Sequence, residues 1–285
     1  MLRKSIFFLV FASLVFGIVG LSQDSFADFS FSEEFGTQGS NDNQFNQPTD
    51  IEVSNDGTKL YVVDSQNNRI KIYELTDGSS CPSGTTEVVD DEVCLDDSFG
   101  SSGSASGRFN IPTGLTIDKN SEDIYVIDSD NNRIQRFQDN GVFDGLEFGS
   151  SNSSDKEYLE GPIAIAMHKS SDYIYVADKE QDSIVVFDDR GVYQFTFDDD
   201  GSGDDFRNPS GLVIDDDGDR LYVADTGDDR IRIFELTDGS SCPSGTTEVV
   251  DDEVCFVDDF GESVSADREF DRPSGLVFDE DNNLL

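Results

Sequence analysis

The residues best suited to chemistry are carboxylates, and the densest group is the run DDDGSGDD at residues 198–205. Its aspartates supply hard oxygen ligands and its glycines permit a tight wrap, a combination that suits Ca²⁺. The run lacks the spacing and the distal glutamate of an EF-hand, so a solvated acidic loop is the alternative. The predicted calcium ligands are Asp198, Asp199, Asp200, Asp204 and Asp205.

The four cysteines form two pairs, each inside a copy of the same segment, at residues 74–94 and 235–255. Zinc usually takes closely spaced cysteines or cysteine with histidine, and the chain has a single histidine. In an exported chain, two local disulfides are the expected use, each worth about 3 kcal/mol in the chain-entropy model. The predicted bonds are Cys81–Cys94 and Cys242–Cys255.

The histidine, His168, aligns with Ser54, Asp118 and Asp215 at the end of a repeated strand. We expect it in a solvent-exposed turn rather than in a catalytic site. No Ser-His-Asp order, phosphate-binding glycine loop or Cys-His pair stands out. The sequence therefore predicts no catalytic residue.

The segments that carry these residues repeat along the chain. A pattern of the form [Leu/Ile]-Tyr-Val-x-Asp followed by a turn and a second strand occurs at residues 60–73, 124–137, 174–187 and 221–234. Each copy follows a proline and a short apolar strand, and no helical period is present. Each repeat reads as four strands, here a to d, of one β-propeller blade.

The repeats predict an all-β, six-bladed propeller of which about four and a half blades are present. Residues 74–94 recur unchanged at 235–255, a shift of 161 residues that spans three blades. We expect the propeller over 28–285, incomplete at its C-terminal end, with c–d hairpin inserts at 74–98 and 235–259. The first strands of the blades are expected to line the central channel.

The motifs Pro-x-Gly-[Leu/Ile], [Leu/Ile]-Tyr-Val-x-Asp and Asn-x-Arg-Ile-x-x-[Phe/Tyr] resemble the NHL repeat. The resemblance covers residues 29–285 and implies a mostly six-bladed propeller that serves as an interaction module, with a few enzymatic relatives. Blade three departs from the pattern, because Ser183 stands where the other blades have arginine.

The repeated turn residues are predicted to be structural. A carboxylate at the end of each strand b is expected to accept backbone N–H bonds, and the arginine that follows is expected to pair with it. Because function should break the symmetry of the repeat, these residues are scaffold candidates. They are Asp64, Arg69, Asp128, Arg133, Asp178, Asp225 and Arg230.

The charge balance and the N-terminus restrict partners and location. With 61 Asp and Glu against 19 Lys and Arg, the net charge of -42 argues against binding nucleic acid or anionic lipid. Basic residues followed by an apolar run in residues 1–27 predict a signal peptide, or an anchor if it stays uncleaved. Either reading places the propeller outside the cytoplasm, and only the anchor would bring it to a membrane.

The function expected from these features is binding of a protein or a cell-surface ligand. A calcium-dependent, lactonase-like hydrolase is the alternative, because the chain has acids in excess. A salt-adapted envelope protein is a further alternative, because the same charge would suit high ionic strength. The sequence leaves the ligand and the oligomeric state open.

Overall fold

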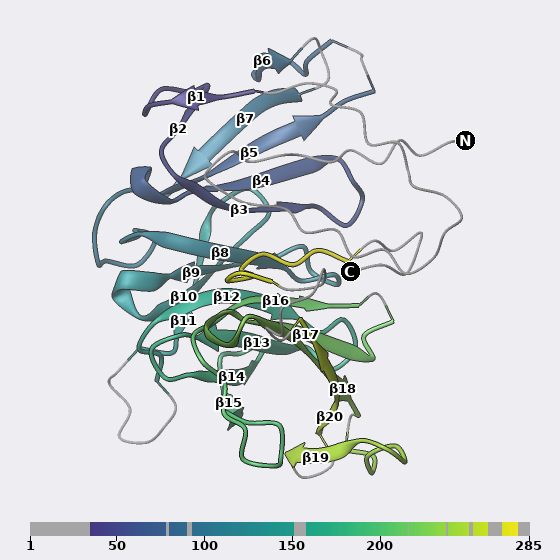
Figure 1. The fold of residues 1–285 in the computed structure, drawn as a ribbon. Helices are drawn as coiled ribbons and strands as arrows, with labels where there is room; N and C mark the ends of the chain where they lie inside the picture. Colours follow the sequence, from purple (N-terminus) through teal and green to yellow (C-terminus); the bar gives the residue numbers. More distant parts are fainter. Residues whose placement is uncertain are drawn as a thin grey trace.

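The computed structural model describes residues 35–77, 80–89, 93–150, 158–215, 217–237, 239–250, 253–261 and 270–278. Four antiparallel sheets, each built from strands consecutive in sequence, form four blades of a propeller (Figure 1). This all-β architecture confirms the fold predicted from the repeats. Blade one has β3 (Pro48–Val53), β4 (Lys59–Asp64), β5 (Arg69–Leu75) and β7 (Val93–Phe99); blade two has β8 (Pro112–Ile117), β9 (Ile124–Asp128), β10 (Arg133–Phe137) and β11 (Phe143–Phe148).

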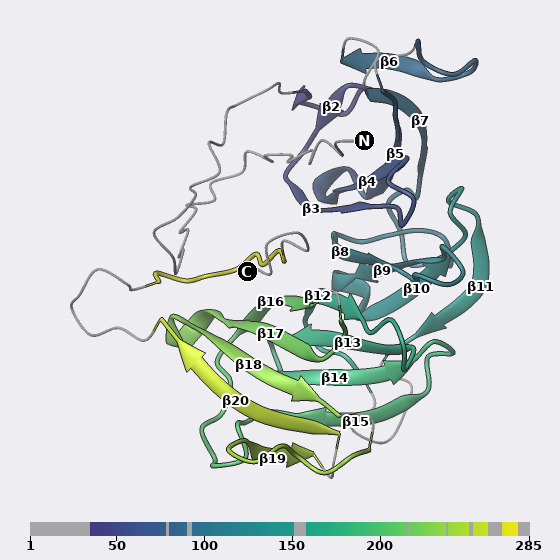
Figure 2. The ribbon, with the colours of Figure 1, turned by 90° about the vertical axis from the view of Figure 1, so that its right-hand side faces the viewer.

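Blades three and four follow the same order. Blade three has β12 (Pro162–Met167), β13 (Tyr173–Asp178), β14 (Ser183–Asp188) and β15 (Tyr193–Phe197); blade four has β16 (Pro209–Ile214), β17 (Arg220–Asp225), β18 (Arg230–Leu236) and β20 (Val254–Phe260). The inner strands β3, β8, β12 and β16 lie side by side (Figure 2). Adjacent blades therefore meet along their inner strands, as the sequence predicts.

The core lies between the blades rather than inside one sheet. Strand b of each blade is buried on both faces, so its residues read as a continuous apolar run. Between blades one and two, Tyr61 and Val63 pack against Leu115 and Ile117. Burial of such apolar side chains, at about 25 cal/mol per Å², is the main force that holds neighbouring blades together.

Each insert adds a fifth strand to the outer edge of its blade. The added strands are β6 (Thr86–Val89) next to β7 and β19 (Thr247–Val250) next to β20. Cys81 bonds to Cys94 and Cys242 to Cys255, with Cα–Cα distances of 5.7 and 5.8 Å. Both predicted disulfides are confirmed.

The two ends of the described chain add little regular structure. The short strands β1 (Thr37–Gln38) and β2 (Gln44–Phe45) pair in parallel before blade one. Residues 270–278 lie beside blade four, where Phe278 packs on Tyr222. The predicted signal segment, residues 1–27, lies outside the described residues, among which no helix is long and apolar enough to span a bilayer.

Candidate functional site

The turn between strands b and c has nearly the same construction in blades one, two and four. In blade two it is the 3₁₀ turn Ser129–Asn131, and Asp128 before it is fully buried. The carboxylate accepts the Asn110 N–H at 2.6 Å and the Arg133 Nε–H at 2.8 Å. The corresponding arginine–aspartate distances are 2.7 Å for Arg69–Asp64 and 3.0 Å for Arg230–Asp225.

These arginines also bind the loop that leads into the blade. Arg133 donates to the carbonyls of Ala105 and Arg108, each at about 3 Å, and to the exposed carboxylate of Glu147. Burial raises the pKa of Asp128, while its hydrogen bonds, including that from Arg133, oppose the rise. The arrangement ties a turn to a loop and leaves no reactive group exposed, so its role is structural.

Blade three holds its aspartate without an arginine. Asp178 is fully buried and accepts four backbone N–H groups, from Glu160, Gly161, Glu180 and Gln181. Burial raises the pKa of this carboxylate, and the backbone bonds oppose the rise. Ser183, in the arginine's place, is 2% exposed and its hydroxyl has no partner among the described residues.

The path of the blade-three turn changes as well. Ser129 and Thr226 open the turns of blades two and four, and their hydroxyls donate to the carbonyls of Pro162 and Pro273 in the next blade. Lys179 stands at this place in blade three and lacks a hydroxyl. Its backbone N–H instead donates to Gly161 O at 3.1 Å.

The segment that leads into blade three also departs from the other blades. The residue before the first proline is left-handed, with φ between 50 and 55°, in Gln47, Ile111, Asn208 and Arg272. Gly161, the glycine of this set, lies outside that region, and a Cβ on it would overlap Glu180. Gly161 is therefore required for close approach of the turn, not for a left-handed backbone.

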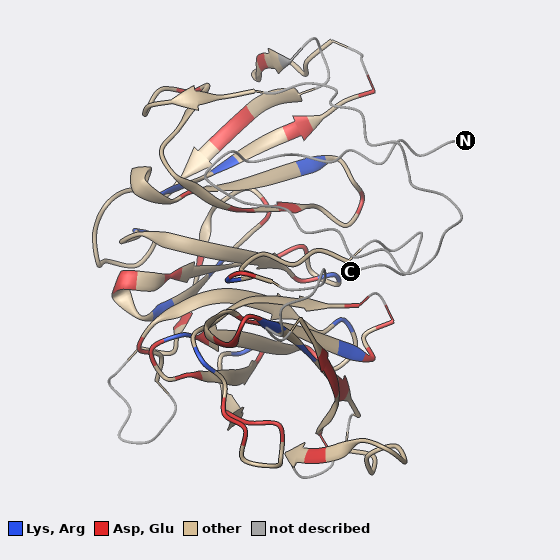
Figure 3. Ribbon diagram, viewed as in Figure 1, with Lys and Arg blue, Asp and Glu red and all other residues tan. Residues whose placement is uncertain are grey.

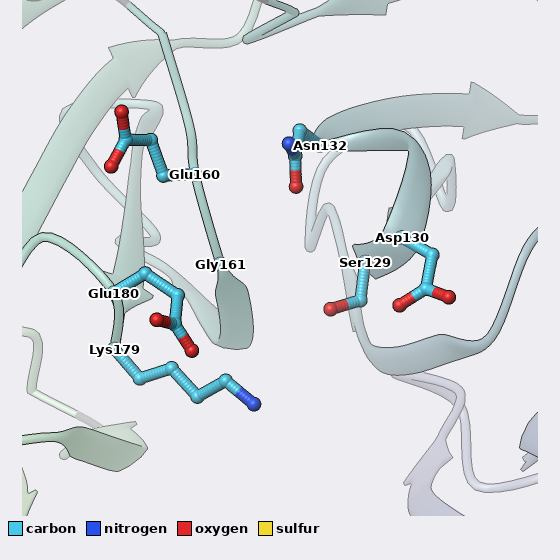
Figure 4. A pocket seen from close by; sticks show the side chains of 7 residues that line it. All are labelled: Ser129, Asp130, Asn132, Glu160, Gly161, Lys179 and Glu180. Carbon is cyan, nitrogen blue, oxygen red and sulfur yellow. The ribbon is translucent and has the colours of Figure 1, made fainter.

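A hollow of about 570 Å³ lies where these departures meet, between the b–c turns of blades two and three. Figure 4 shows Glu160, Lys179 and Glu180 on one side, and Asp130, Asn132 and Ser129 on the other. Asp130, Glu160 and Glu180 are exposed, whereas Lys179 is partly buried. Three carboxylates, one ammonium group and an amide thus border a single opening, a set that can bind a polar or cationic group.

The structure places the predicted calcium ligands in the loop between blades three and four. Asp204 forms ion pairs with Arg230 at 2.7 Å and Arg232 at 3.4 Å. Asp199 and Asp200 accept backbone N–H bonds from their own loop, from Gly201 and Ser202. Among the described residues, no three His, Cys, Asp or Glu side chains are grouped so that they could hold a metal ion. Calcium binding by this run stays a prediction.

His168 is not the solvent-exposed residue that the sequence suggested. It is 4% exposed, and its Nε2 lies 2.6 Å from Gly218 O of blade four. Its Nδ1 accepts the N–H groups of Ser170 and Ser171. The expectation was wrong because the turn of the adjacent blade covers the ring, a contact between residues far apart in sequence.

Sequence reasoning missed the residues of the hollow. Lys179, Glu180 and Glu160 belong to the blade whose departure was visible at Ser183, so the signal was present in the turn sequence. What the sequence did not reveal is that the turn of blade two supplies the opposite wall. Acidic residues also occur in the loops of every blade (Figure 3), which hides this group in composition alone.

The comparisons with known proteins agree with the fold. The family model described as "6-bladed beta-propeller" matches residues 117–260. A solved protein of unknown function from Desulfotomaculum acetoxidans DSM 771 is 15% identical, with a TM-score of 0.50, and the match covers 78% of this chain and 58% of that one. A virginiamycin B lyase from Staphylococcus aureus is 17% identical, with a TM-score of 0.44, and the match covers 74% and 62%.

At these identities the solved structures show similarity of fold alone. The chain spans about three fifths of the length of each of these two structures. No curated protein matches it. The family match covers half of the chain, and the four described blades have the strand order of a propeller. The chain belongs to the 6-bladed beta-propeller family.

Proposed function

We propose that this propeller is a binding module whose ligand site is the hollow between the b–c turns of blades two and three. One observation carries the proposal: the hollow lies at the b–c turn that abandons the repeated construction. A scaffold residue is expected to repeat from blade to blade, whereas a residue retained for binding needs to occur once. The turn of blade three meets the second description.

The preferred partner is a protein that presents a Lys or Arg side chain. Asp130 approaches the opening from blade two, and Glu160 and Glu180 approach it from blade three. Against them stands Lys179 alone, so the opening attracts a cationic group. The net charge of -42 favours the same class of partner and speeds its approach at low ionic strength.

Two further inferences concern the repeat type and the location. The Tyr-Val-x-Asp and Arg-Ile-x-x-[Phe/Tyr] motifs support repeats of the NHL type. Two disulfides are compatible with an extracytoplasmic location, since such bonds persist in oxidising compartments. A secreted or surface-attached binding module fits both inferences.

The test uses an array of short peptides that differ only by one central Lys, Arg or Gln. We compare the unmodified protein with the double variant Glu160→Gln/Glu180→Gln. The matched control is Asp42→Asn/Glu87→Gln, which removes the same charge from exposed sites away from the hollow. We expect Lys or Arg peptides to lose at least about tenfold in affinity for the hollow variant, and less than about twofold for the control.

Two results would contradict this assignment. Equal losses in both variants would mean that attraction comes from the overall charge and not from the hollow. Absence of any preference for Lys or Arg over Gln would remove the cationic partner. Repeating the titration in calcium and in chelator at fixed ionic strength shows separately whether the metal affects binding.

A further inference from the structure

The inner strand of blade one carries a carboxylate where the other blades carry almost no side chain. Asp50 is the third residue of β3, and the matching residues of β8, β12 and β16 are Gly114, Ala164 and Gly211. The difference is visible in the sequence, but nothing in the repeat indicates what Asp50 contacts. It is a second break in the symmetry of the propeller, independent of the hollow.

The small residues at this place reflect the close approach of neighbouring inner strands. A Cβ on Gly114 would lie 3.3 Å from the carbonyl oxygen of Ile163 in blade three. A Cβ on Gly211 would overlap the carbonyl oxygen of Ser274. A carboxylate at the equivalent place in blade one must therefore occupy the seam between blades one and two.

The contacts of Asp50 show that it bridges this seam. Its Oδ2 accepts the N–H of Leu115 in β8 at 2.8 Å, and its Oδ1 accepts the N–H of Ile51 at 2.9 Å. The opposite residue on β4 is Val63, and Gly114 lies against Oδ2. These neighbours offer the carboxylate two backbone donors and no cation.

The charged groups nearest in the fold do not neutralise Asp50. Glu52 lies two residues further along the same face of β3, and Asp64, at the end of β4, is already paired with Arg69. Loss of water in the seam raises the pKa of Asp50 to about 7, and the bonds from Leu115 and Ile51 oppose the rise. The carboxyl group therefore changes its charge near neutral pH.

We propose that Asp50 makes the seam between blades one and two a proton-controlled joint, closed when the carboxyl group is neutral and loosened when it is ionised. The sign follows from linkage: a carboxyl pKa raised from 3.8 to about 7 stabilises the folded seam most below 3.8. That contribution is lost as pH rises through about 7. Neutral or alkaline conditions thus open the joint and acidic conditions close it.

The test measures amide hydrogen exchange of β3 and β8 between pH 5 and 8, corrected for intrinsic exchange rates. In the unmodified protein we expect protection of Leu115 and its neighbours to fall by about tenfold or more over this range, because each pKa unit corresponds to a factor of ten. Asp50→Asn should abolish most of this dependence. Glu52→Gln, on the same face of the same strand, should retain it.

A second variant guards against a folding defect in the first. Asp50→Gly installs the residue that blades two and four use at this place, and it should also give protection that does not depend on pH. If unmodified protein and both Asp50 variants show the same slope with pH, the joint is not controlled by this residue. If Glu52→Gln removes the slope instead, the titrating group is Glu52 and the proposal is wrong.

Discussion

Blade two and blade three solve the same structural problem in different ways. Each must hold a buried aspartate at the end of strand b, and blade two does so with Arg133, whose guanidinium also ties down the preceding loop. Blade three uses four backbone N–H groups around Asp178. The second solution needs no arginine, and the turn side chains Lys179 and Glu180 border the opening between the blades.

The comparison teaches that a repeat can lose a conserved-looking contact without losing its fold. Gln181 shows how, because its side chain donates to Tyr158 O at 2.8 Å. In blade two Arg133 donates to Arg108 O, the carbonyl at the same place before the blade. The turn of blade three is thus a complete alternative structure, and not a damaged copy.

The largest effect is expected when the arginine of blade two is removed. Arg133→Met should lower the free energy of unfolding by about 3–5 kcal/mol at pH 7, because it leaves Asp128 buried without a cation. The loss should shrink towards pH 4, since the raised pKa of Asp128 disfavours its ionised form in the fold. Urea unfolding at both pH values measures it.

The control for this prediction is Ser183→Ala in blade three. It removes a buried hydroxyl that has no hydrogen-bond partner among the described residues, so it should change stability by less than about 0.5 kcal/mol. Equal losses for Arg133→Met and Ser183→Ala would show that the two turns are held in the same way.

An intermediate effect is expected for Asp178→Asn. The amide oxygen can keep only some of the four N–H bonds, while its NH₂ group faces the remaining donors, at a cost of about 1–3 kcal/mol. Asp128→Asn should cost more, because it also leaves Arg133 buried without its counterion. Thermal unfolding of the two variants side by side gives the order, and the reverse order would contradict the contrast drawn between the blades.

The smallest effect, and the sharpest, concerns conversion of one turn into the other. Ser183→Arg alone should cost about 1–3 kcal/mol, because Gln181 already binds the loop carbonyl and the site is buried. Adding Gln181→Asn restores the residue types of blade two and should recover about 0.5–2 kcal/mol as coupling. A double-mutant cycle by urea unfolding measures this term, and strict additivity would show that the two side chains do not share a site.

Much of the architecture could be predicted from single residues and their spacing. The apolar strands after each proline, the four Tyr-Val-x-Asp motifs and the exact recurrence of residues 74–94 indicate a propeller with two stapled hairpins. The hollow could not be predicted in the same way, because its walls come from turns about 50 residues apart. His168 was misjudged for the same reason, as its partner Gly218 belongs to the next blade.

The sequence by itself determined the strand order, the blade pattern and the disulfide pairs, because each depends on periodicity or on neighbours within one repeat. Only the tertiary structure decided that Asp50 bridges two blades, that Asp204 is engaged by Arg230, and that Lys179 faces the turn of blade two. The physical reason is the packing of one blade on the next. It brings together side chains that no local pattern connects and removes water from some of them while leaving others exposed.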